Sequence, residues 1–321
     1  MLFIIFFLLF LGIVVAAALL SYGAEIFAER WGANFVGSVV LGLITTLPEF
    51  FFVIWACIKN QYQMAVGSAV GACSLLVTLG YGLVILVATT KLSKKPVREI
   101  HLSKTTQIDA IYLLVTSAVA FFLAWEKNGL DLKDAAILIA IFLGYVVHLA
   151  REAYQFAKTL EEEHIFTGSL FKAGLALAAG GAMIFFLSEP FVDSMIEVAH
   201  RVGLSPVTIA VVLGPIASEM PEKMAAYLTV RRDAKLAEIS VCNFIGSKVN
   251  HNSLLLGALP IISVLRGGGQ VEGVLTGSFI LMTVLTVIAT LSLASRKLRR
   301  WEGIMFLILY LVVVSEAILR Y

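Results

Sequence analysis

The chain has 321 residues, of which 60% are hydrophobic and only 14% are charged, and its mean hydropathy is +0.93. About a quarter of the residues of a soluble domain are charged, so this composition excludes an ordinary soluble protein. It predicts a polytopic membrane protein embedded in a lipid bilayer. The net charge of +2 says little by itself, and we expect no nucleic-acid partner.

Ten apolar runs are long enough to cross a hydrocarbon core of about 30 Å. The expected helices cover residues 2–22, 35–58, 63–89, 107–125, 132–154, 168–188, 205–229, 236–264, 271–294 and 302–319. No basic segment precedes the first run, so we expect a spanning helix there rather than a cleaved signal peptide. The predicted fold class is therefore an all-α membrane protein with ten transmembrane helices.

The distribution of lysine and arginine predicts how these helices are oriented. If the N-terminus is outside, sixteen basic residues fall in the cytoplasmic connections and six fall on the opposite side. Because connections rich in lysine and arginine stay in the cytoplasm, both termini are expected outside. We expect a multi-pass protein of the plasma membrane, and no pattern in the sequence predicts its oligomeric state.

A short pattern occurs twice, each time inside an apolar run. Residues 45–49 read Thr-Thr-Leu-Pro-Glu, and residues 218–222 read Ser-Glu-Met-Pro-Glu. A segment of small residues follows each of them, at residues 66–74 in the first half and at residues 241–248 in the second. Such a recurrence at matched helices predicts an internal repeat.

The repeat divides the chain into two five-helix halves, residues 1–157 and 168–321. The charged segment 158–167 between them is expected to be a cytoplasmic linker. Because each half has an odd number of spans, the second half must cross the membrane in the opposite sense to the first. This is the inverted repeat of secondary transporters, whose binding site lies between the halves near the middle of the bilayer.

Proline and glutamate are both costly inside a membrane helix, which indicates that the chain uses them. Pro48 lacks an N–H, so the carbonyl of Ile44 loses its helical partner, and Pro221 does the same to Ala217. Each segment therefore offers carbonyl oxygens within one turn of a hydroxyl group and a carboxylate. This set of oxygens suits a hard cation such as Ca2+. The alternative is that the two prolines only kink packing helices.

Three further ionisable residues near the second segment have two interpretations each. Glu219 shares a helix face with Glu222, so one of the two would tend to hold a proton, unless Glu219 forms an ion pair with Lys223. His251 is either a cation ligand or a hydrogen-bonded packing group. Lys248 would repel a divalent cation or occupy part of the site at rest.

These segments resemble those of the cation/Ca2+ exchanger superfamily, the sodium/calcium exchangers and their relatives. Each of that family's two repeats carries a G-T-S-L-P-E-type segment followed by G-N-x-I-G-S-N. The matching residues here are 45–49 with 67–71, and 218–222 with 243–247, and residues 300–304 are similar to the entry of the family's last helix. The resemblance implies ten helices, an outside N-terminus and an ion site at the membrane midplane.

Carried over to this chain, the resemblance implies a Ca2+ site with two central carboxylates, Glu49 and Glu222. It implies further ligands from backbone oxygens and polar side chains, at Thr45, Ser218, Ser68, Asn243 and Ser247. The chain departs from the family where Ser68 and Lys248 replace asparagine, where Glu219 replaces a hydroxyl residue, and where Leu76 and His251 replace amide or acidic residues. Most of these positions would complete separate Na+ sites, so the coupling ion stays open between Na+ and H+.

The expected function is a secondary active antiporter that exchanges Ca2+, or a related cation, for Na+ or H+ by alternating access. Its partners would be inorganic cations and the lipid bilayer, and its metal ligands would include Glu219 and His251. No H-E-x-x-H, G-x-S-x-G or P-loop motif occurs, so neither an enzyme nor a cofactor is expected. Two alternatives are a non-transporting cation-binding scaffold or sensor, closed by Lys248, and a transporter of small organic solutes on the same fold.

Overall fold

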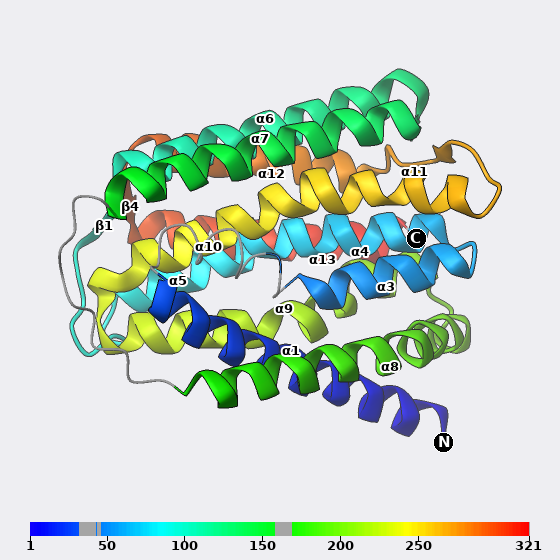
Figure 1. Cartoon of the computed structure of the whole chain (residues 1–321), viewed down its shortest axis with the longest axis horizontal. Helices are drawn as coiled ribbons and strands as arrows, with labels where there is room; N and C mark the ends of the chain where they lie inside the picture. The colour runs from blue at the N-terminus through cyan, green and yellow to red at the C-terminus, as the bar shows by residue number, and fades with distance from the viewer. Residues whose placement is uncertain (32–42, 44–45, 158–168, 321) are drawn as a thin grey trace.

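The computed structural model describes residues 1–31, 43, 46–157 and 169–320, with some of their side chains left out (Figure 1). The predicted linker 158–167, Thr45 and the start of the predicted second span lie outside the described residues. Seven helical segments within them are long and apolar enough to cross a membrane. The chain is therefore an all-helical, multi-pass membrane protein, whereas the count of ten spans stays a prediction.

Long helices account for most of the described chain. Six of the seven candidate spans are single helices, namely α1 (Leu2–Trp31), α6 (Lys104–Lys127), α7 (Leu132–Ala157), α8 (Leu170–Val202), α12 (Gly277–Ala294) and α13 (Arg300–Arg320). The remaining span is the composite of α4 (Tyr62–Leu75), a π-helical turn η2 (Leu76–Gly80) and α5 (Tyr81–Thr89). The second half has a similar composite of α10 (Ala237–Asn250), η4 (His251–Leu255) and α11 (Leu256–Leu265).

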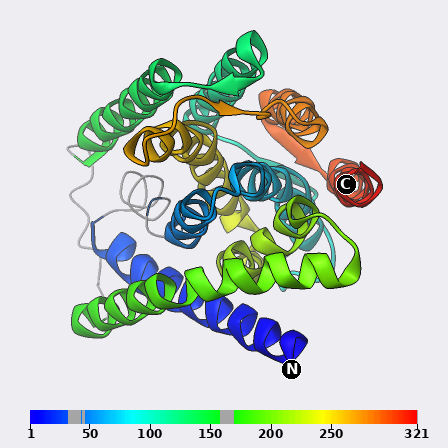
Figure 2. The same cartoon turned by 90° about the vertical axis from the view of Figure 1, so that its right-hand side faces the viewer.

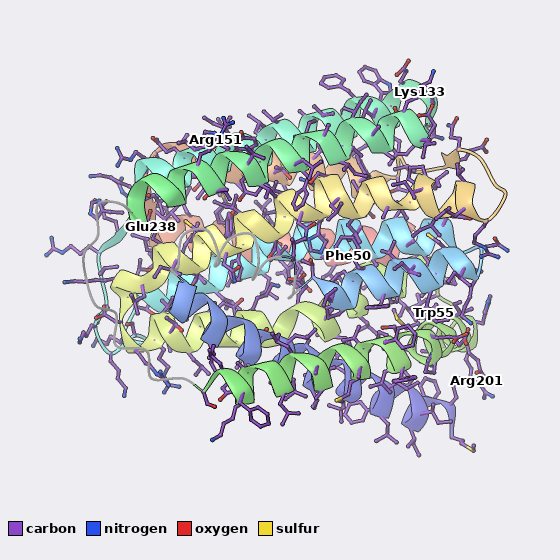
Figure 3. All side chains as sticks on the ribbon, in the orientation of Figure 1. Phe50, Trp55, Lys133, Arg151, Arg201 and Glu238 are labelled. Carbon is purple, nitrogen blue, oxygen red and sulfur yellow. The ribbon has the colours of Figure 1, made fainter. Side chains whose placement is uncertain are left out.

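The helices run side by side along the long axis of the molecule (Figure 1). Helices α6 and α7 form one side of the bundle, α1 and α8 cross its opposite side, and the two composite helices lie between them (Figure 2). Charged side chains such as Lys133, Arg151, Arg201 and Glu238 lie towards the two ends (Figure 3). This distribution suits a bundle whose middle faces lipid.

The two composite helices are built alike. Each begins with a 14-residue α-helix, which leads into a five-residue π-helical turn, at Leu76–Gly80 in one and at His251–Leu255 in the other. Leu76 and His251, which the resemblance pairs with each other, are the first residues of these turns. Because π-helical turns are rare and often mark functional sites, their matched positions favour the predicted repeat.

The composite helices contribute to two separate apolar clusters, and the change from one cluster to the other occurs near the π-helical turns. One buried cluster contains Val70 and Cys73 before the first turn and Leu255 at the end of the second. Another contains Leu76 at the first turn and Val249 just before the second. The polar residues at the turns therefore lie where two apolar clusters meet, well away from both ends of the bundle.

Glycine allows α4 to pack against α9 (Pro206–Arg232) at close range. A Cβ atom at Gly71 would overlap the backbone of Val211, and one at Gly67 would lie 3.0 Å from Val207 Cγ1. The absence of side chains at these two positions lets the two backbones approach, as in other small-residue helix contacts in membranes. This contact brings Ser68 of α4 next to Gly214 of α9, where a Cβ would be 3.4 Å from Ser68 Oγ.

The two prolines of the repeated pattern act differently. Helix α3 (Leu47–Ile58) begins with Pro48 in its first turn, a position that proline tolerates well because no N–H is needed there. Helix α9, in contrast, continues through Pro221 to Arg232. The break expected at Pro48 is the start of α3, whereas the break expected at Pro221 is wrong, because α9 continues through it.

Short strands and ion pairs tie the connections together at both ends. Strand β1 (Glu99–His101) pairs antiparallel with β4 (Lys297–Arg299), and β2 (Gly129–Leu130) pairs with β3 (Val271–Glu272). Glu99 of β1 contacts Lys297 at 3.0 Å and Arg299 at 3.2 Å, and these contacts hold the pKa of its carboxyl below the usual value. These links join connections that are far apart in the sequence.

Candidate cation site

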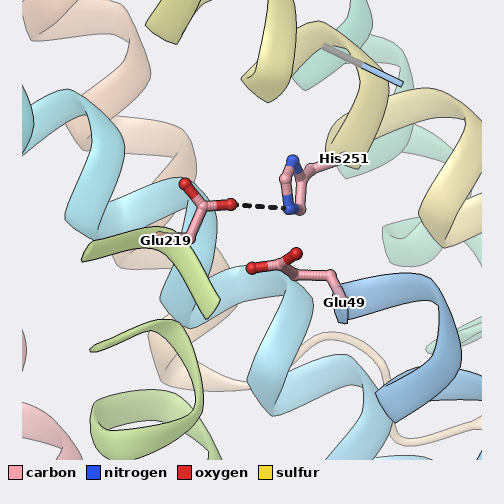
Figure 4. Close-up of side chains that lie close together, drawn as sticks. All are labelled: Glu49, Glu219 and His251. Atoms are coloured by element: carbon pink, nitrogen blue, oxygen red, sulfur yellow. Dashed lines mark ion pairs between the residues drawn. The ribbon is translucent and has the colours of Figure 1, made fainter. Parts of the chain in front are cut away.

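Three buried ionisable side chains meet inside the bundle. Glu49 of α3, Glu219 of α9 and His251 of η4 are each at most 1% exposed, and one ligand atom from each lies within 4.8 Å of the others (Figure 4). They come from three different elements and from both halves of the chain. Two carboxylates and an imidazole at this spacing can hold a metal ion between them.

Glu49 supplies a carboxylate that forms no ion pair with the side chains that the structure describes. It lies in the first turn of α3, where the helix N-terminus favours a negative charge. Neither of its carboxylate oxygens has a hydrogen-bond partner among the described residues. A buried carboxylate without hydrogen bonds is strongly unfavourable, so this position is suited to a cation.

A small pocket opens at Glu49. It is lined by polar groups from both halves and by apolar side chains of three helices, namely Ile13, Pro48, Glu49, Phe52, Ser68, Ser188, Phe191, Gly214 and Ser218. The hydroxyl of Ser218 donates to the Gly214 carbonyl at 3.0 Å, so its lone pairs remain available to a ligand. The pocket thus combines one carboxylate with hydroxyl oxygens, which are ligands of hard cations.

Glu219 differs from Glu49 because a side chain of opposite charge lies in contact with it. Lys223 Nζ lies 2.6 Å from Glu219 Oε2 and 3.3 Å from the Glu219 carbonyl oxygen, and it is 5.5 Å from the centre of the Phe244 ring. Lys223 is fully buried. Of the two interpretations of Glu219 from the sequence, the ion pair with Lys223 is the one found in the structure.

His251 faces Glu219 from the second π-helical turn. Its Nδ1 lies 2.6 Å from the Ser247 carbonyl oxygen, which can only accept, so Nδ1 carries a proton. Its Nε2 lies 3.5 Å from Glu219 Oε1, as the dashed line in Figure 4 marks. His251 is therefore oriented by its own helix, and its second nitrogen is turned to the carboxylates.

Lys248 brings a second buried ammonium group into this region. It is fully buried in α10, and its Nζ has no hydrogen-bond partner within the part of the chain that the structure describes. Lys248 precedes His251 by three residues, so the two positions share one face of the composite helix. Nearby, the Cys73 thiol donates to Asn252 Oδ1 at 3.3 Å, which ties α4 to η4.

The structure brings five of the predicted ligands together. Glu49, Ser68 and Ser218 line the pocket, and Glu219 and His251 form the adjoining cluster. Ser247 is buried and contacts His251 through its carbonyl, whereas Asn243 is half-buried in α10 and does not line the pocket. Thr45 and the side chain of Glu222 lie outside what the structure describes.

Several lining positions were not predicted from the sequence, among them one hydroxyl residue and one glycine. Ser188 of α8 and Gly214 of α9 lie outside both repeated segments. Serine and glycine are common in membrane helices, so neither residue carries a signal in the sequence. Only the packing of α8 and α9 around α3 brings them to Glu49.

A comparison with protein-family models matches this chain over most of its length. The model described as sodium/calcium exchanger protein covers residues 1–151 and 172–319. Among curated proteins, an uncharacterized membrane protein of Methanocaldococcus jannaschii is 23% identical over 93% of this chain and 94% of its own. The inner membrane protein YrbG of Escherichia coli is 25% identical over 78% of this chain and 77% of its own.

Solved structures show the same fold. The crystal structure of the H+/Ca2+ exchanger CAX superposes with a TM-score of 0.80 at 21% identity, over 98% of this chain and 84% of that one. The sodium-calcium exchanger NCX_Mj, soaked with Na+ and Sr2+, superposes with a TM-score of 0.69 at 21% identity, over 98% and 99% of the two chains. The arrangement of helices around Glu49 is thus that of known membrane exchangers.

Proposed function

Because the chain belongs to the sodium/calcium exchanger family, we propose that it is a secondary active antiporter that exchanges Ca2+, or a related cation, for Na+ or H+. The observation that carries this proposal is the Glu49 carboxylate. It is 1% exposed, it has no hydrogen-bond partner among the described residues, and it lines a pocket with hydroxyl groups from both halves. This position offers a buried carboxylate whose negative charge a mobile cation would neutralise.

Glu222 is the second carboxylate of the proposed site. It follows Ser218 by four residues in the helical segment α9, so the two positions share one face of that helix. Ser218 lines the pocket at Glu49. Two carboxylates would balance the charge of one divalent cation, and Ser68, with the backbone of Thr45 and the side chains of Asn243 and Ser247, would add neutral oxygens.

Exchange would follow from competition for the same carboxylates. An empty site leaves buried negative charge inside the membrane, which is unfavourable by at least a few kcal/mol. A site loaded with Ca2+ or with the driving cations is closer to neutral. The change between the two open states would therefore be fast only when the site is loaded, and this condition couples the two ion fluxes.

The direction of the chain in the membrane is part of the same proposal. The excess of lysine and arginine in alternate connections favours both termini outside and the β1–β4 end in the cytoplasm. We place the protein in the plasma membrane on this basis. With this orientation, opening of the β1–β4 end would expose the site to the cytoplasm, and opening of the other end would expose it to the outside.

The coupling ion of the proposed exchange is either Na+ or H+. Of the two structural relatives, one is described as an H+/Ca2+ exchanger and the other as a sodium-calcium exchanger. Lys223 occupies a carboxylate oxygen of Glu219, and Lys248 adds a second buried positive charge, and both disfavour additional Na+ ions in this chain. Separate imposed gradients of Na+ and H+ decide between the two.

The test is 45Ca uptake into proteoliposomes that contain the purified full-length protein. Uptake is measured under an outward Na+ gradient and, separately, under an outward H+ gradient. The variants Glu49→Gln and Glu222→Gln remove the proposed carboxylates while keeping their shape. Glu272→Gln is a matched control, because Glu272 is an exposed carboxylate of β3 away from the pocket.

Uptake under one gradient, lost in both site variants and kept in the control, would support the exchange and identify the coupling ion. Normal flux in both Glu49→Gln and Glu222→Gln would contradict the assignment of the site. Ca2+ binding without uptake under either gradient would point to a cation-binding scaffold instead. Uptake of organic solutes but not of cations would point to the other alternative function.

A further inference from the structure

The two buried carboxylates of the cluster are not equivalent. Glu219 is 1% exposed and contacts the Lys223 ammonium at 2.6 Å through Oε2, whereas its Oε1 faces His251 Nε2 at 3.5 Å. Glu49 has no such neighbour among the described residues. One carboxylate of the cluster is thus already balanced by a cation that belongs to the protein, and the other is not.

The pair of Glu219 and Lys223 lies within one helix. The two residues are four apart in α9, so they occupy adjacent positions on one face, one turn apart. Their contact therefore does not depend on how α9 lies against α3 or η4. If the helices move relative to one another during transport, this ion pair moves as a unit, whereas an ion held jointly by Glu49 and Glu219 would link two separate elements.

The surroundings of Lys223 keep it at Glu219. Its ammonium also contacts the Glu219 carbonyl oxygen at 3.3 Å, and it lies 5.5 Å from the centre of the Phe244 ring, which favours a cation. The side chain is 0% exposed, so water cannot replace these contacts. Breaking a buried ion pair of this kind is strongly unfavourable because it leaves both charges uncompensated.

We propose that Lys223 is a tethered cation that determines the ion selectivity of the site, because it permanently neutralises Glu219 and takes the place of a mobile monovalent cation. This inference rests on the proposed exchange at Glu49. It goes further by assigning Glu219 to the protein's own ammonium and the mobile ions to the carboxylate that has no partner. A neutral residue at position 223 would then free Glu219 and create an additional place for Na+.

The experiment compares neutral and charged replacements of Lys223 in the purified full-length protein. Lys223→Met and Lys223→Gln remove the ammonium, and Lys223→Arg keeps a positive charge at the same position. Thermal unfolding in detergent is followed while NaCl replaces choline chloride at constant ionic strength. An ion that binds the folded state raises the melting temperature, so the method detects Na+ without requiring transport.

We expect Na+ to raise the melting temperature of the two neutral variants by about 2 °C more than that of the unmodified protein and of Lys223→Arg. The same response to Na+ in all four proteins would overturn the proposal. 45Ca binding to the unmodified protein, measured in parallel, tests the exchange proposal separately. If that binding is absent, the Na+ response of the neutral variants still decides the role of Lys223.

A second measurement does not depend on the folding of any variant. Crystals of the unmodified protein are soaked with Sr2+, whose position is found by anomalous scattering. We expect Lys223 to remain on Glu219 while the ion lies at Glu49. An Sr2+ ion bound to Glu219, with Lys223 displaced, would overturn the proposal.

Discussion

The Asn250 side-chain amide donates a hydrogen bond of 2.7 Å to Thr46 Oγ1, and the two residues are 204 positions apart in the chain. Thr46 directly precedes α3 and is three residues from Glu49, while Asn250 directly precedes η4 and His251. Both side chains are at most 2% exposed. This bond therefore fixes the start of the helix that carries Glu49 against the turn that carries His251.

Removing this bond with Asn250→Ala is expected to weaken both the fold and the proposed site. Loss of a buried hydrogen-bond partner lowers the free energy of unfolding by about 1–3 kcal/mol. The apparent affinity for Ca2+ should fall several-fold, because the start of α3 loses its support. Thermal unfolding and 45Ca binding measure the two effects. Ser253→Ala is the control, since the Ser253 hydroxyl donates only to Val249 of its own helical segment; equal affinity loss in both variants would contradict the prediction.

Gly71→Ala is expected to disturb the contact between α4 and α9. A Cβ at this position would overlap the Val211 backbone, which cannot move aside as a flexible side chain does. Overpacking of this kind lowers the free energy of unfolding by about 1–3 kcal/mol. The matched control is Gly181→Ala in α8, where no atom lies within 4 Å of the added Cβ and alanine suits the helix better than glycine. A melting temperature for Gly71→Ala as high as for Gly181→Ala would show that the two helices can separate.

The membrane fold was predictable because long apolar runs leave few alternatives to spanning helices. The repeat was also visible, since Pro48 and Pro221 each precede a glutamate in an apolar run. The different positions of the two prolines within their helices were not predictable. Pro48 starts α3, whereas Pro221 lies within the continuous α9, and the choice depends on the packing around each segment rather than on its five residues.

The composition of the site was predictable only in part. Glu49, Ser68 and Ser218 stand out as polar residues in apolar runs, and all three line the pocket. Ser188 and Gly214 reach the same pocket through helix packing, for which the sequence gives no local signal. For Glu219 the i, i+4 spacing to Lys223 did carry the signal for an ion pair.

The charge of Asp131 is expected to stabilise the fold by the same amount across the physiological pH range. Its Oδ1 accepts hydrogen bonds from the backbone N–H groups of Lys133 and Asp134 at the start of α7, and its Oδ2 contacts Lys127 at 2.6 Å. The contact with Lys127 is the main reason why the pKa of the carboxyl falls to about 2. A lowered pKa means that the stabilisation is complete above the ordinary pKa near 4 and is lost only as the pH falls through about 2.

Asp131→Asn should therefore lower the melting temperature by the same amount at pH 5 and at pH 8. Asp131→Ala should lower it further, because it also removes the helix cap, which is worth about 1 kcal/mol. Thermal unfolding in detergent at the two pH values checks both expectations. A difference between Asp131→Asn and the unmodified protein that changes strongly from pH 5 to pH 8 would show that another group titrates with this contact.

Lys248→Met is expected to stabilise the fold and to strengthen Ca2+ binding. The ammonium is fully buried and has no hydrogen-bond partner among the residues whose side chains are described. Methionine has a similar length and no charge, so the free energy of unfolding should rise by about 1–3 kcal/mol. Lys248 shares a helix face with His251, which lies in one cluster with Glu49, so removing the positive charge should lower the Kd for Ca2+.

The two effects of Lys248→Met are separable by experiment. Thermal unfolding measures the stability of the fold, and 45Ca binding and uptake measure the affinity and the transport rate. Lys133→Met is the control, because Lys133 is an exposed lysine of α7. Tighter binding together with faster uptake would mean that Lys248 restrains an active exchanger. Uptake that appears only in the variant would mean that Lys248 closes the site of the natural protein. A lower melting temperature would contradict the prediction, because it would show that Lys248 is paired with a carboxylate in the folded protein.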